Sequence, residues 1–248
     1  MSRIEVLPVE GLPEFEQDMA IGEEIATRTK IAAGDVVVVS QKIVSKAEGR
    51  IRRLSAAIPG AEARRLAALL GKEPALVELI LGESREVLRA ERGVLIVETR
   101  HGFVCANAGV DSSNLAEEGT VALLPEDPDA SARRIRKEIE AASGIAPAAI
   151  VSDSFGRAWR LGQAEVAIGC AGIAPLDDWR GRADAGGREL EATVIAIADE
   201  AAAAADLVRD KTGRVPAAIV RGLERHVTAD DGPGAASVRR PRSEDLFR

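Results

Sequence analysis

A metal ion and a phosphate group could bind just after position 151, where polar side chains follow an apolar run. Residues 148–151 predict a buried strand, and Asp153 and Ser154 come directly after it. Carboxylate and hydroxyl oxygens are ligands for hard cations such as Mg²⁺. Arg157 and Arg160 come next, and the planar guanidinium group binds phosphate and carboxylate oxygens. A charged turn explains Asp153 and Ser154 alone equally well, but it does not explain the two arginines.

A second carboxylate follows another predicted strand. The apolar run 94–97 predicts this strand, and Asp111 and Asn114 lie in the stretch of small residues after it. An Asx turn is the alternative explanation of the sequence Asp-Ser-Ser-Asn. Two carboxylates from separate strand ends can share one divalent cation beside substrate phosphates. Because Asp153 also follows a strand, we favour a shared metal site.

A third polar segment follows the valine run 36–39, which predicts a fully buried strand. Ser40, Gln41 and Lys46 bring hydroxyl, amide and ammonium groups to the carboxyl end of this strand, where open α/β sheets bind ligands. The segment lacks the glycines of a P-loop or of a Rossmann turn. It therefore belongs to neither of these motifs.

Composition and charge narrow the classes of protein to which the chain can belong. The net charge of -7 argues against nucleic-acid binding, because no basic face could easily dominate the surface. No apolar run reaches about 18 residues, the length typical of a membrane span, and the N-terminus has no signal-peptide pattern. Cys105 and Cys170 are too few and too far apart for a disulfide framework or a zinc site. We therefore expect a cytoplasmic protein that binds neither nucleic acid nor a membrane.

Hydrophobic patterns along the chain predict an α/β protein. Apolar runs predict strands over residues 4–9, 36–39, 94–97, 148–151 and 217–220. Helical spacing and composition predict helices over residues 21–29, 61–70, 74–81, 131–143 and 190–209. Residues 49–92 have a helical texture as a whole, and the polar, glycine-rich stretch 177–187 is expected to be a mobile loop. We expect one domain over residues 1–227, and a flexible tail over residues 228–248, which are rich in Gly, Pro and Arg.

Several long blocks of the sequence, in the same order, are similar to one family of enzymes. They are GLPEF, VVVVSQKIVSKAEGR, VLIVETRHGFVCANAGVDSSN, IVSDSFGRAWRLGQAEVAIGCAGI, the Asp-Trp-Arg-Gly loop, LEATVIAIADEAAAAADLV and PAAIVRG. These blocks cover nearly the whole chain and resemble the coenzyme F420-0:L-glutamate ligases, also called γ-glutamyl ligases.

The resemblance implies a fold, a set of cofactors and an assembly. The implied fold is an α/β arrangement of mixed sheets and helices with two interlocked subdomains, and the implied assembly is a homodimer. The implied co-substrate is GTP and the implied metal is Mg²⁺ or Mn²⁺, with K⁺ as a further candidate cation. The implied substrates are the deazaflavin coenzyme F420-0 and L-glutamate.

The resemblance also implies roles for individual residues. The positions that match the family's nucleotide contacts are Gly11, Leu12, Pro13, Glu14, Ser40, Gln41, Lys46, Asn114, Asp206, Arg209, Asp210, Lys211 and Gly213. The positions that match its metal ligands are Asp111, Asp153 and, for a second ion, Ser154. Lys46 is the candidate for a catalytic phosphate contact. Arg157 and Arg160 are the candidates for binding the acyl phosphate or the substrate's phosphodiester or carboxylates.

The sequence departs from the family at Arg209, Asp210 and Lys211. The family often has Met-Gly followed by Gln there, and glutamine offers an oxygen to the second metal ion whereas lysine does not. Two hypotheses follow from this difference. Either Asp210 supplies the oxygen, or the ammonium group of Lys211 replaces the second ion; we favour the second hypothesis.

The residues that we single out suit phosphoryl transfer. Phosphoryl transfer is catalysed by positioning and charge neutralisation, which require metals and cations more than a nucleophile. The implied reaction activates a carboxylate as an acyl phosphate, which the amine of glutamate then attacks. Two other hypotheses remain: a metal-dependent phosphotransferase or phosphohydrolase on the same scaffold, and a non-catalytic GTP sensor that signals through residues 177–187.

Overall fold

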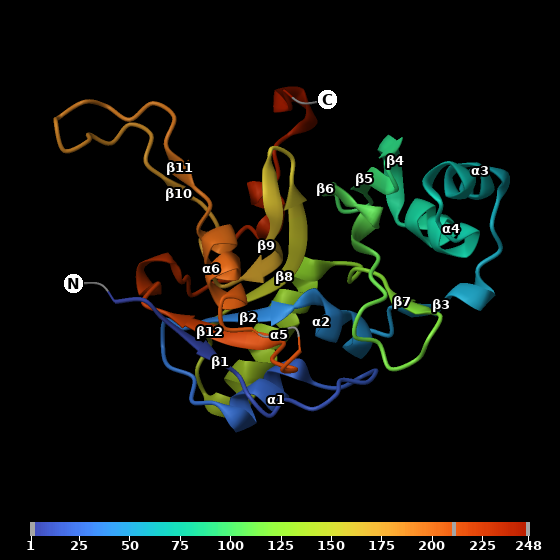
Figure 1. Cartoon of the computed structure of the whole chain (residues 1–248). Helices are drawn as coiled ribbons and strands as arrows, with labels where there is room; N and C mark the ends of the chain where they lie inside the picture. The colour runs from blue at the N-terminus through green and yellow to red at the C-terminus, as the bar shows by residue number, and fades with distance from the viewer. Residues whose placement is uncertain (1–2, 210–211, 247–248) are drawn as a thin grey trace.

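A central mixed sheet brings together segments from both ends of the chain (Figure 1). The computed structural model describes residues 3–209 and 212–246, and within them the sheet has the strand order β1, β12, β2, β8, β9. The bounds of these strands are Glu5–Pro8 for β1, Ala217–Arg221 for β12, Val36–Ser40 for β2, Ala148–Arg157 for β8 and Arg160–Ala171 for β9. β2 and β8 run parallel, and the other neighbouring strands run antiparallel. The predicted α/β class with mixed sheets is confirmed.

Helices cover both faces of this sheet, which is why its central strand can be apolar throughout. The hydrophobic core on one face includes α1 (Ile21–Arg28) and α5 (Pro128–Ser143), and the core on the other face includes α6 (Ile197–Asp206). Val37 and Val39 of β2 belong to the first core, and the alternate valines of the same strand belong to the second. Because successive side chains of a strand point to opposite faces, a run of four valines fills two cores at once.

Helix α2 (Gln41–Ala47) begins where β2 ends. The hydroxyl group of Ser40 caps it by accepting a hydrogen bond from the backbone N–H of Lys42 at 3.4 Å. The polar groups that follow the valine run therefore lie on a helix. Lys42 and Lys46 are four residues apart and lie on the same face of that helix.

Residues 51–122 form a second group of elements beside the central sheet (Figure 1). In order they are β3 Ile51–Arg53, a 3₁₀ turn at Leu54–Ala56, α3 Ala61–Leu70, α4 Pro74–Gly82, β4 Ser84–Glu91, β5 Val94–Thr99, β6 Val104–Ala106, a 3₁₀ turn at Asn107–Gly109 and β7 Thr120–Ala122. β3 pairs with β7, and β4, β5 and β6 form a three-stranded sheet. This group has a hydrophobic cluster of its own, which includes Leu66, Ile80 and Leu95.

The helices predicted over 61–70 and 74–81 are confirmed, but the helical texture assigned to residues 49–92 is wrong for residues 51–53 and 84–91. Residues 51–53 form β3, and residues 84–91 form β4, which pairs antiparallel with β5. Charged and apolar residues are mixed in this stretch, so its short-range spacing suits a helix as well as a strand. The pairing with β5 decides between them.

The strand predicted over residues 148–151 is confirmed, but it is six residues longer than expected at its carboxyl end. β8 continues to Arg157, turns at 158–159 and returns as β9, so that the two strands form a long hairpin. The outer half of this hairpin carries polar side chains on both strands. An antiparallel ribbon can face solvent, so polar residues do not end the strand.

The helix predicted over 190–209 begins only at Ile197. The β-branched residues Val194–Ile195 form the short strand β11, which pairs with β10 (Asp177–Asp178). Residues 179–193 connect these two strands as an arm that projects away from the rest of the molecule (Figure 1). Part of the expected helix is therefore the base of this arm.

Helix α5 begins at Pro128, three residues before the predicted start, and ends at Gly144 as predicted. The carboxylate of Asp127 caps it by accepting a hydrogen bond from the backbone N–H of Ala130 at 2.9 Å, and Gly144 has φ 75°. Cys105 and Cys170 are free and buried. None of the helices in the described residues is long and apolar enough to cross a membrane.

Part of the C-terminal segment, which we expect to be flexible, packs against the core. The guanidinium group of Arg136 in α5 is buried and donates hydrogen bonds to Asp231 and to the backbone oxygens of Thr228 and Ala229. Ala235 is fully buried. Short 3₁₀ helices lie at Glu224–His226, Ala235–Val238 and Arg242–Glu244. A buried guanidinium group needs hydrogen-bond acceptors, and this segment supplies them from two backbone oxygens and the Asp231 carboxylate.

Candidate active site

A cleft of 690 Å³ lies at the carboxyl end of β2, beside the point where β8 leaves the core. Segments that are far apart in the sequence line it: the first loop, α2, the loop after β6, the β8–β9 hairpin and the residues around the end of α6. The predicted site residues that it brings together are Leu12, Pro13, Glu14, Ser40, Gln41, Lys46, Asp111, Asn114, Asp153, Ser154, Asp206 and Arg209.

Asp111 is held by an Asx turn and by a lysine. Its Oδ1 atom accepts a hydrogen bond from the backbone N–H of Ser113 at 2.8 Å, and its Oδ2 atom accepts one from the Ser113 hydroxyl at 2.9 Å. The ammonium group of Lys42 lies 2.6 Å from Oδ2. Burial acts to raise the pKa of Asp111, but the hydrogen bonds and charge of Lys42 and the hydrogen bonds of Ser113 outweigh it and lower this pKa. Asp111 is therefore held in its ionised form.

Asp153 has the opposite electrostatic environment. Burial, followed by the negative charges of Glu165 and Asp111, raises its pKa to about 7. A carboxylate in this position is unstable as an anion until a cation approaches it. Asp153 and Asp111 both line the cleft, so that a cation between them would relieve their repulsion.

Glu165 of β9 contacts three polar side chains in or beside the cleft. Its Oε2 atom accepts hydrogen bonds from the Ser152 hydroxyl at 2.6 Å and lies 2.6 Å from Nη2 of Arg209, while its Oε1 atom accepts one from the Ser154 hydroxyl at 2.5 Å. Only 6% of the Arg209 side chain and 7% of the Glu165 side chain are exposed. Burial acts to raise the pKa of Glu165, but Arg209 and the two serines lower it overall. The hydroxyl of Ser154 donates a hydrogen bond to Glu165, which fixes its orientation in the cleft.

The oxygen donors of the cleft suit a hard divalent cation. Two carboxylates, Asp111 and Asp153, and the hydroxyl of Ser154 are the chemistry that Mg²⁺ and Mn²⁺ prefer. Within residues 3–209 and 212–246, no group of three or more His, Cys, Asp or Glu side chains is arranged to hold a metal ion. An ion here would thus need oxygens from phosphates and water, which is the usual situation of Mg²⁺ beside a nucleotide.

Lys46 connects the predicted nucleotide segments. Its ammonium group forms an ion pair with Glu14 of the first loop and donates a hydrogen bond to the backbone oxygen of Asn114 at 3.2 Å. Only 12% of the Lys46 side chain is exposed. Three segments that the sequence interpretation assigned separately to the nucleotide therefore meet at one ammonium group.

Not every predicted site residue lines the cleft. Arg157 and Arg160 lie at the exposed tip of the β8–β9 hairpin, where Arg157 donates a hydrogen bond to the backbone oxygen of Leu161 at 2.6 Å. The hairpin carries both arginines away from the carboxylates. The backbone oxygen of Gly11 accepts a hydrogen bond from Nε of Arg28 at 2.6 Å, and Gly11 lies just outside the lining.

Gly213 and Gln41 differ in how they relate to the cleft. Gly213 is exposed, although its neighbours Thr212 and Arg214 line the cleft. Gln41 lines the cleft but is buried, and its Oε1 atom accepts a hydrogen bond from the Ser45 hydroxyl at 2.9 Å. Asp210 and Lys211 lie outside the described residues.

The sequence interpretation missed three charged residues of the cleft, Lys42, Glu165 and Arg214. Lys42 precedes Lys46 by one helical turn. Once residues 41–47 are recognised as a helix, this spacing predicts that both lysines face the same site. Glu165 lies directly opposite Ser154 in the β8–β9 register. That pairing depends on the register of the hairpin, and no local pattern in the sequence predicts it.

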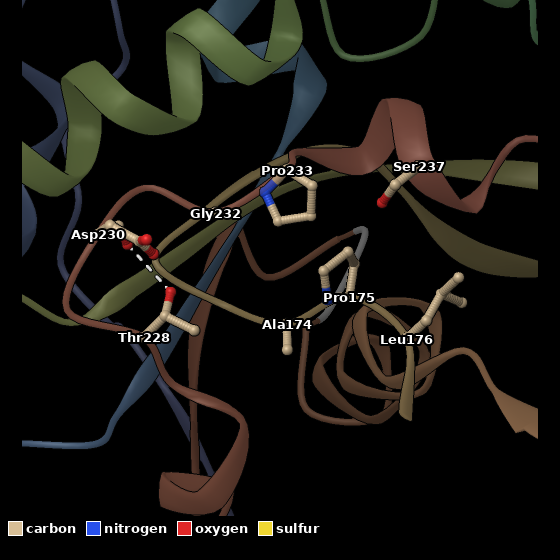
Figure 2. A pocket seen from close by; sticks show the side chains of 8 residues that line it. All are labelled: Ala174, Pro175, Leu176, Thr228, Asp230, Gly232, Pro233 and Ser237. Atoms are coloured by element: carbon tan, nitrogen blue, oxygen red, sulfur yellow. Dashed lines mark hydrogen bonds between the residues drawn. The ribbon is translucent and has the colours of Figure 1, made fainter. Parts of the chain in front are cut away.

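A second, open hollow of 440 Å³ lies between the segment that follows β9 and the C-terminal segment (Figure 2). Its lining consists of Ala174, Pro175, Leu176, Thr228, Asp230, Gly232, Pro233 and Ser237. The Thr228 hydroxyl donates a hydrogen bond to the backbone oxygen of Asp230 at 3.0 Å. Among the described residues, no lysine or arginine belongs to this lining, so the hollow offers less to a phosphate than the cleft does.

The family model and the similar curated proteins all belong to one family of enzymes. The family model described as F420-0:Gamma-glutamyl ligase matches residues 11–222. The coenzyme F420:L-glutamate ligase of Methanothermobacter thermautotrophicus is 44% identical over 255 residues, covering 99% of both chains. The enzymes of the same name from Archaeoglobus fulgidus and Methanocaldococcus jannaschii are 43% and 41% identical, covering 99% of this chain and 97% of each relative.

Proposed function

The chain belongs to the F420-0:gamma-glutamyl ligase family, and we propose that it is a GTP-dependent ligase that adds L-glutamate to coenzyme F420-0. The product is F420-1, with longer γ-glutamyl tails as a possible continuation of the same reaction. The observation that carries this proposal is the cleft that Asp111, Asp153 and Lys46 line together. It combines two carboxylates that suit a metal ion with an ammonium group that suits a phosphate.

The proposed reaction has two steps. A carboxylate oxygen of F420-0 first attacks the γ-phosphorus of GTP, the bond to the β-phosphate oxygen breaks, and an acyl phosphate and GDP form. The amine of glutamate then attacks the acyl carbon, phosphate leaves with the electrons of the C–O bond, and the amine loses a proton. Neither step needs a covalent intermediate on the protein. This agrees with a cleft whose described lining contains no Cys or His.

The residues of the cleft have distinct roles in this proposal. Asp111 and Asp153 would hold one Mg²⁺ or Mn²⁺ ion and the Ser154 hydroxyl would contribute to a second, and these ions when bound would neutralise the negative charge of the phosphates. Lys46 binds phosphate oxygens as a point charge. Glu165 fixes both Ser154 and the buried guanidinium group of Arg209. K⁺ as a further cation, the homodimer, the cytoplasmic location and the substrate role of Arg157 and Arg160 stay predictions.

Product mass tests the proposal. We would mix the protein with GTP, Mn²⁺, glutamate and F420-0, and expect the mass of F420-0 to rise by one or more glutamyl units. Asp111→Asn and Asp153→Asn should each lower turnover by at least about 100-fold, the order expected when a major electrostatic stabiliser is lost. Near-normal turnover in either variant at saturating Mn²⁺ would contradict the metal assignment.

The same mixture separates the alternatives. Phosphate release that does not require glutamate and F420-0 would indicate a phosphohydrolase, and transfer of phosphate to another acceptor would indicate a phosphotransferase. Binding of GTP without any turnover would indicate a sensor. Substitution of ATP for GTP tests the nucleotide directly, and equal turnover with both would contradict GTP dependence.

A further inference from the structure

Lys42 has a position in the cleft that the proposed reaction does not yet explain. Its ammonium group lies 2.6 Å from Oδ2 of Asp111, 2.7 Å from the backbone oxygen of Ser113 and 2.7 Å from the Ser113 hydroxyl. A lysine ammonium has three hydrogen atoms to donate, and here each has an acceptor within hydrogen-bond distance. Only 14% of the Lys42 side chain is exposed. Lys42 is thus a fixed cation rather than a mobile surface charge.

The Asp111 oxygen that Lys42 contacts has little capacity left. Oδ2 is within hydrogen-bond distance of both Lys42 and the Ser113 hydroxyl, and a carboxylate oxygen has about two lone-pair directions. Oδ1 accepts one hydrogen bond, from the backbone N–H of Ser113. A second cation on Asp111 would also lie close to the ammonium group. Like charges a few ångströms apart repel each other strongly near a protein surface, where the effective dielectric is about 20.

We propose that Lys42 occupies the cation position on Asp111 in the metal-free protein and competes there with the divalent ion. The proposal rests on the proposed function only through the assignment of Asp111 as a metal ligand. Metal binding then requires Lys42 to leave Oδ2. Because Lys42 is one helical turn before Lys46 and lines the same cleft, its displaced ammonium group stays within the region assigned to phosphate. Lys42 therefore couples metal binding to nucleotide binding.

Lys46 provides a matched comparison within the same helix. Its ammonium group is paired with Glu14 and with the backbone oxygen of Asn114, and no contact is recorded between it and Asp111 or Asp153 among the described residues. Removing Lys46 removes one positive charge from the cleft without freeing Asp111. A comparison of the two lysines thus separates local competition from the general electrostatic effect of one positive charge.

The test is a Mn²⁺ titration of the full chain without nucleotide, with free Mn²⁺ measured by its electron paramagnetic resonance signal. Lys42→Met should bind Mn²⁺ at least about tenfold more tightly than the wild type, which corresponds to about 1.4 kcal/mol. Lys46→Met should change the affinity by less than about threefold, since its charge does not act on Asp111 directly. Lys137→Met, which alters an exposed lysine of α5, should not change it.

Further variants test whether the effect comes from the charge of Lys42 and from its contact with Asp111. Lys42→Arg keeps the charge and should not tighten binding, and Lys42→Gln should repeat the result of Lys42→Met if methionine disturbs folding. Addition of Asp111→Asn to Lys42→Met should abolish the gained affinity. Added GTP should tighten Mn²⁺ binding by a larger factor in the wild type than in Lys42→Met, because nucleotide phosphates attract the ammonium group away from Asp111.

Several results would overturn the inference. They are unchanged or weaker Mn²⁺ binding in both Lys42→Met and Lys42→Gln, equal tightening in Lys46→Met, retention of the gained site after Asp111→Asn, and no Mn²⁺ binding by any variant. None of these measurements involves F420-0, glutamate or turnover. A failed competition with a positive ligase assay would therefore reject only the role of Lys42, and competition without ligation would reject only the proposed function.

Discussion

Two carboxylates of the cleft, Asp111 and Asp153, have opposite electrostatic environments. Lys42 lowers the pKa of Asp111, whereas burial and the charges of Glu165 and Asp111 raise the pKa of Asp153 to about 7. The negative charge of Asp153, which would attract a metal ion, therefore makes the metal-free protein less stable, whereas that of Asp111 does not. At the scale of single residues, binding capacity is obtained at the expense of folding stability, as is common in active sites.

The raised pKa of Asp153 predicts a pH-dependent loss of stability. In the unfolded chain this carboxyl group has a pKa of about 3.9. Between about pH 4 and 7 the folded state binds more protons than the unfolded state, so the contribution of Asp153 to the free energy of unfolding falls as pH rises. Asp153→Asn should therefore raise that free energy by up to about 4 kcal/mol at pH 8, and change it little near pH 4.

Urea unfolding at pH 4 and pH 8, with a chelator present, measures this difference. Glu140→Gln, which alters an exposed carboxylate of α5, is the control and should give the same small change at both pH values. An Asp153→Asn protein that is no more stable than the wild type at pH 8 would show that the carboxyl group is not destabilised by its surroundings.

Lys46 should matter for nucleotide binding and for turnover. A charged hydrogen bond contributes about 1.5 to 3 kcal/mol, so Lys46→Ala should weaken GTP binding by about 10- to 100-fold. The substitution also leaves Glu14 without its partner in the cleft, and that carboxylate would repel phosphates. Calorimetric titration with GTP measures the affinity, and Lys137→Ala is the control. Equal effects from the two substitutions would mean that the phosphate site lies elsewhere.

At the scale of elements, the β8–β9 hairpin connects the core with the cleft. Its inner half is buried in the central sheet, and its outer half carries Ser154 and Glu165. Gly169 of β9 lies directly against Pro128 at the start of α5, where a Cβ atom would overlap the backbone of Pro128. Gly156, near the tip, has nothing within 4 Å of the position of an added Cβ atom. Close packing therefore requires glycine at position 169 but not at position 156.

Alanine substitution should distinguish these two glycines. Gly169→Ala should lower the free energy of unfolding by about 1 to 3 kcal/mol or more, because the strand and α5 must separate to admit the methyl group. Gly156→Ala, in the same hairpin, should be neutral or slightly stabilising, since it only reduces the freedom of the unfolded chain. Urea unfolding measures both. A Gly169→Ala protein as stable as Gly156→Ala would contradict the close packing of β9 against α5.

At the scale of the whole molecule, the C-terminal segment closes one side of the core. Arg136 is buried and depends on Asp231 and on two backbone oxygens of that segment for most of its acceptors. Ala235 belongs to the same hydrophobic cluster as α6. Residues 228–235 therefore contribute to the domain that we predicted to end at residue 227.

Removal of residues 228–248 should destabilise the protein strongly. The truncation leaves Arg136 as a buried cation with the backbone oxygen of Pro147 as its remaining recorded acceptor, and breaking such a pair costs about 3 to 5 kcal/mol. Removal of residues 240–248 alone deletes the exposed ion pairs of Arg242, each worth about 0 to 1 kcal/mol. Thermal unfolding compares the two truncations, and equal melting temperatures would support the flexible tail.

The sequence by itself determined the chemistry of the cleft. Ser40, Lys46 and Asp153 each follow a run of apolar residues that forms a buried strand of the central sheet, and such a run is a local property of the chain. Asp111 instead follows β6 and a 3₁₀ turn outside that sheet, so its place in the cleft depends on the packing of residues 51–122. Because ligand sites of α/β sheets lie at strand ends, these polar groups could be assigned to one site without knowledge of the packing. The two cores are likewise encoded locally, since four consecutive valines require cover on both faces.

Only the tertiary structure decided which other charges join that site. Glu165 reaches Ser154 through the register of the β8–β9 hairpin, and the same hairpin takes Arg157 and Arg160 away from the cleft. The ends of α6 and the strand at residues 84–91 depend in the same way on partners elsewhere in the chain. A polar ribbon has no apolar face to fix its register, so its pairing follows from contacts that no short stretch of sequence contains.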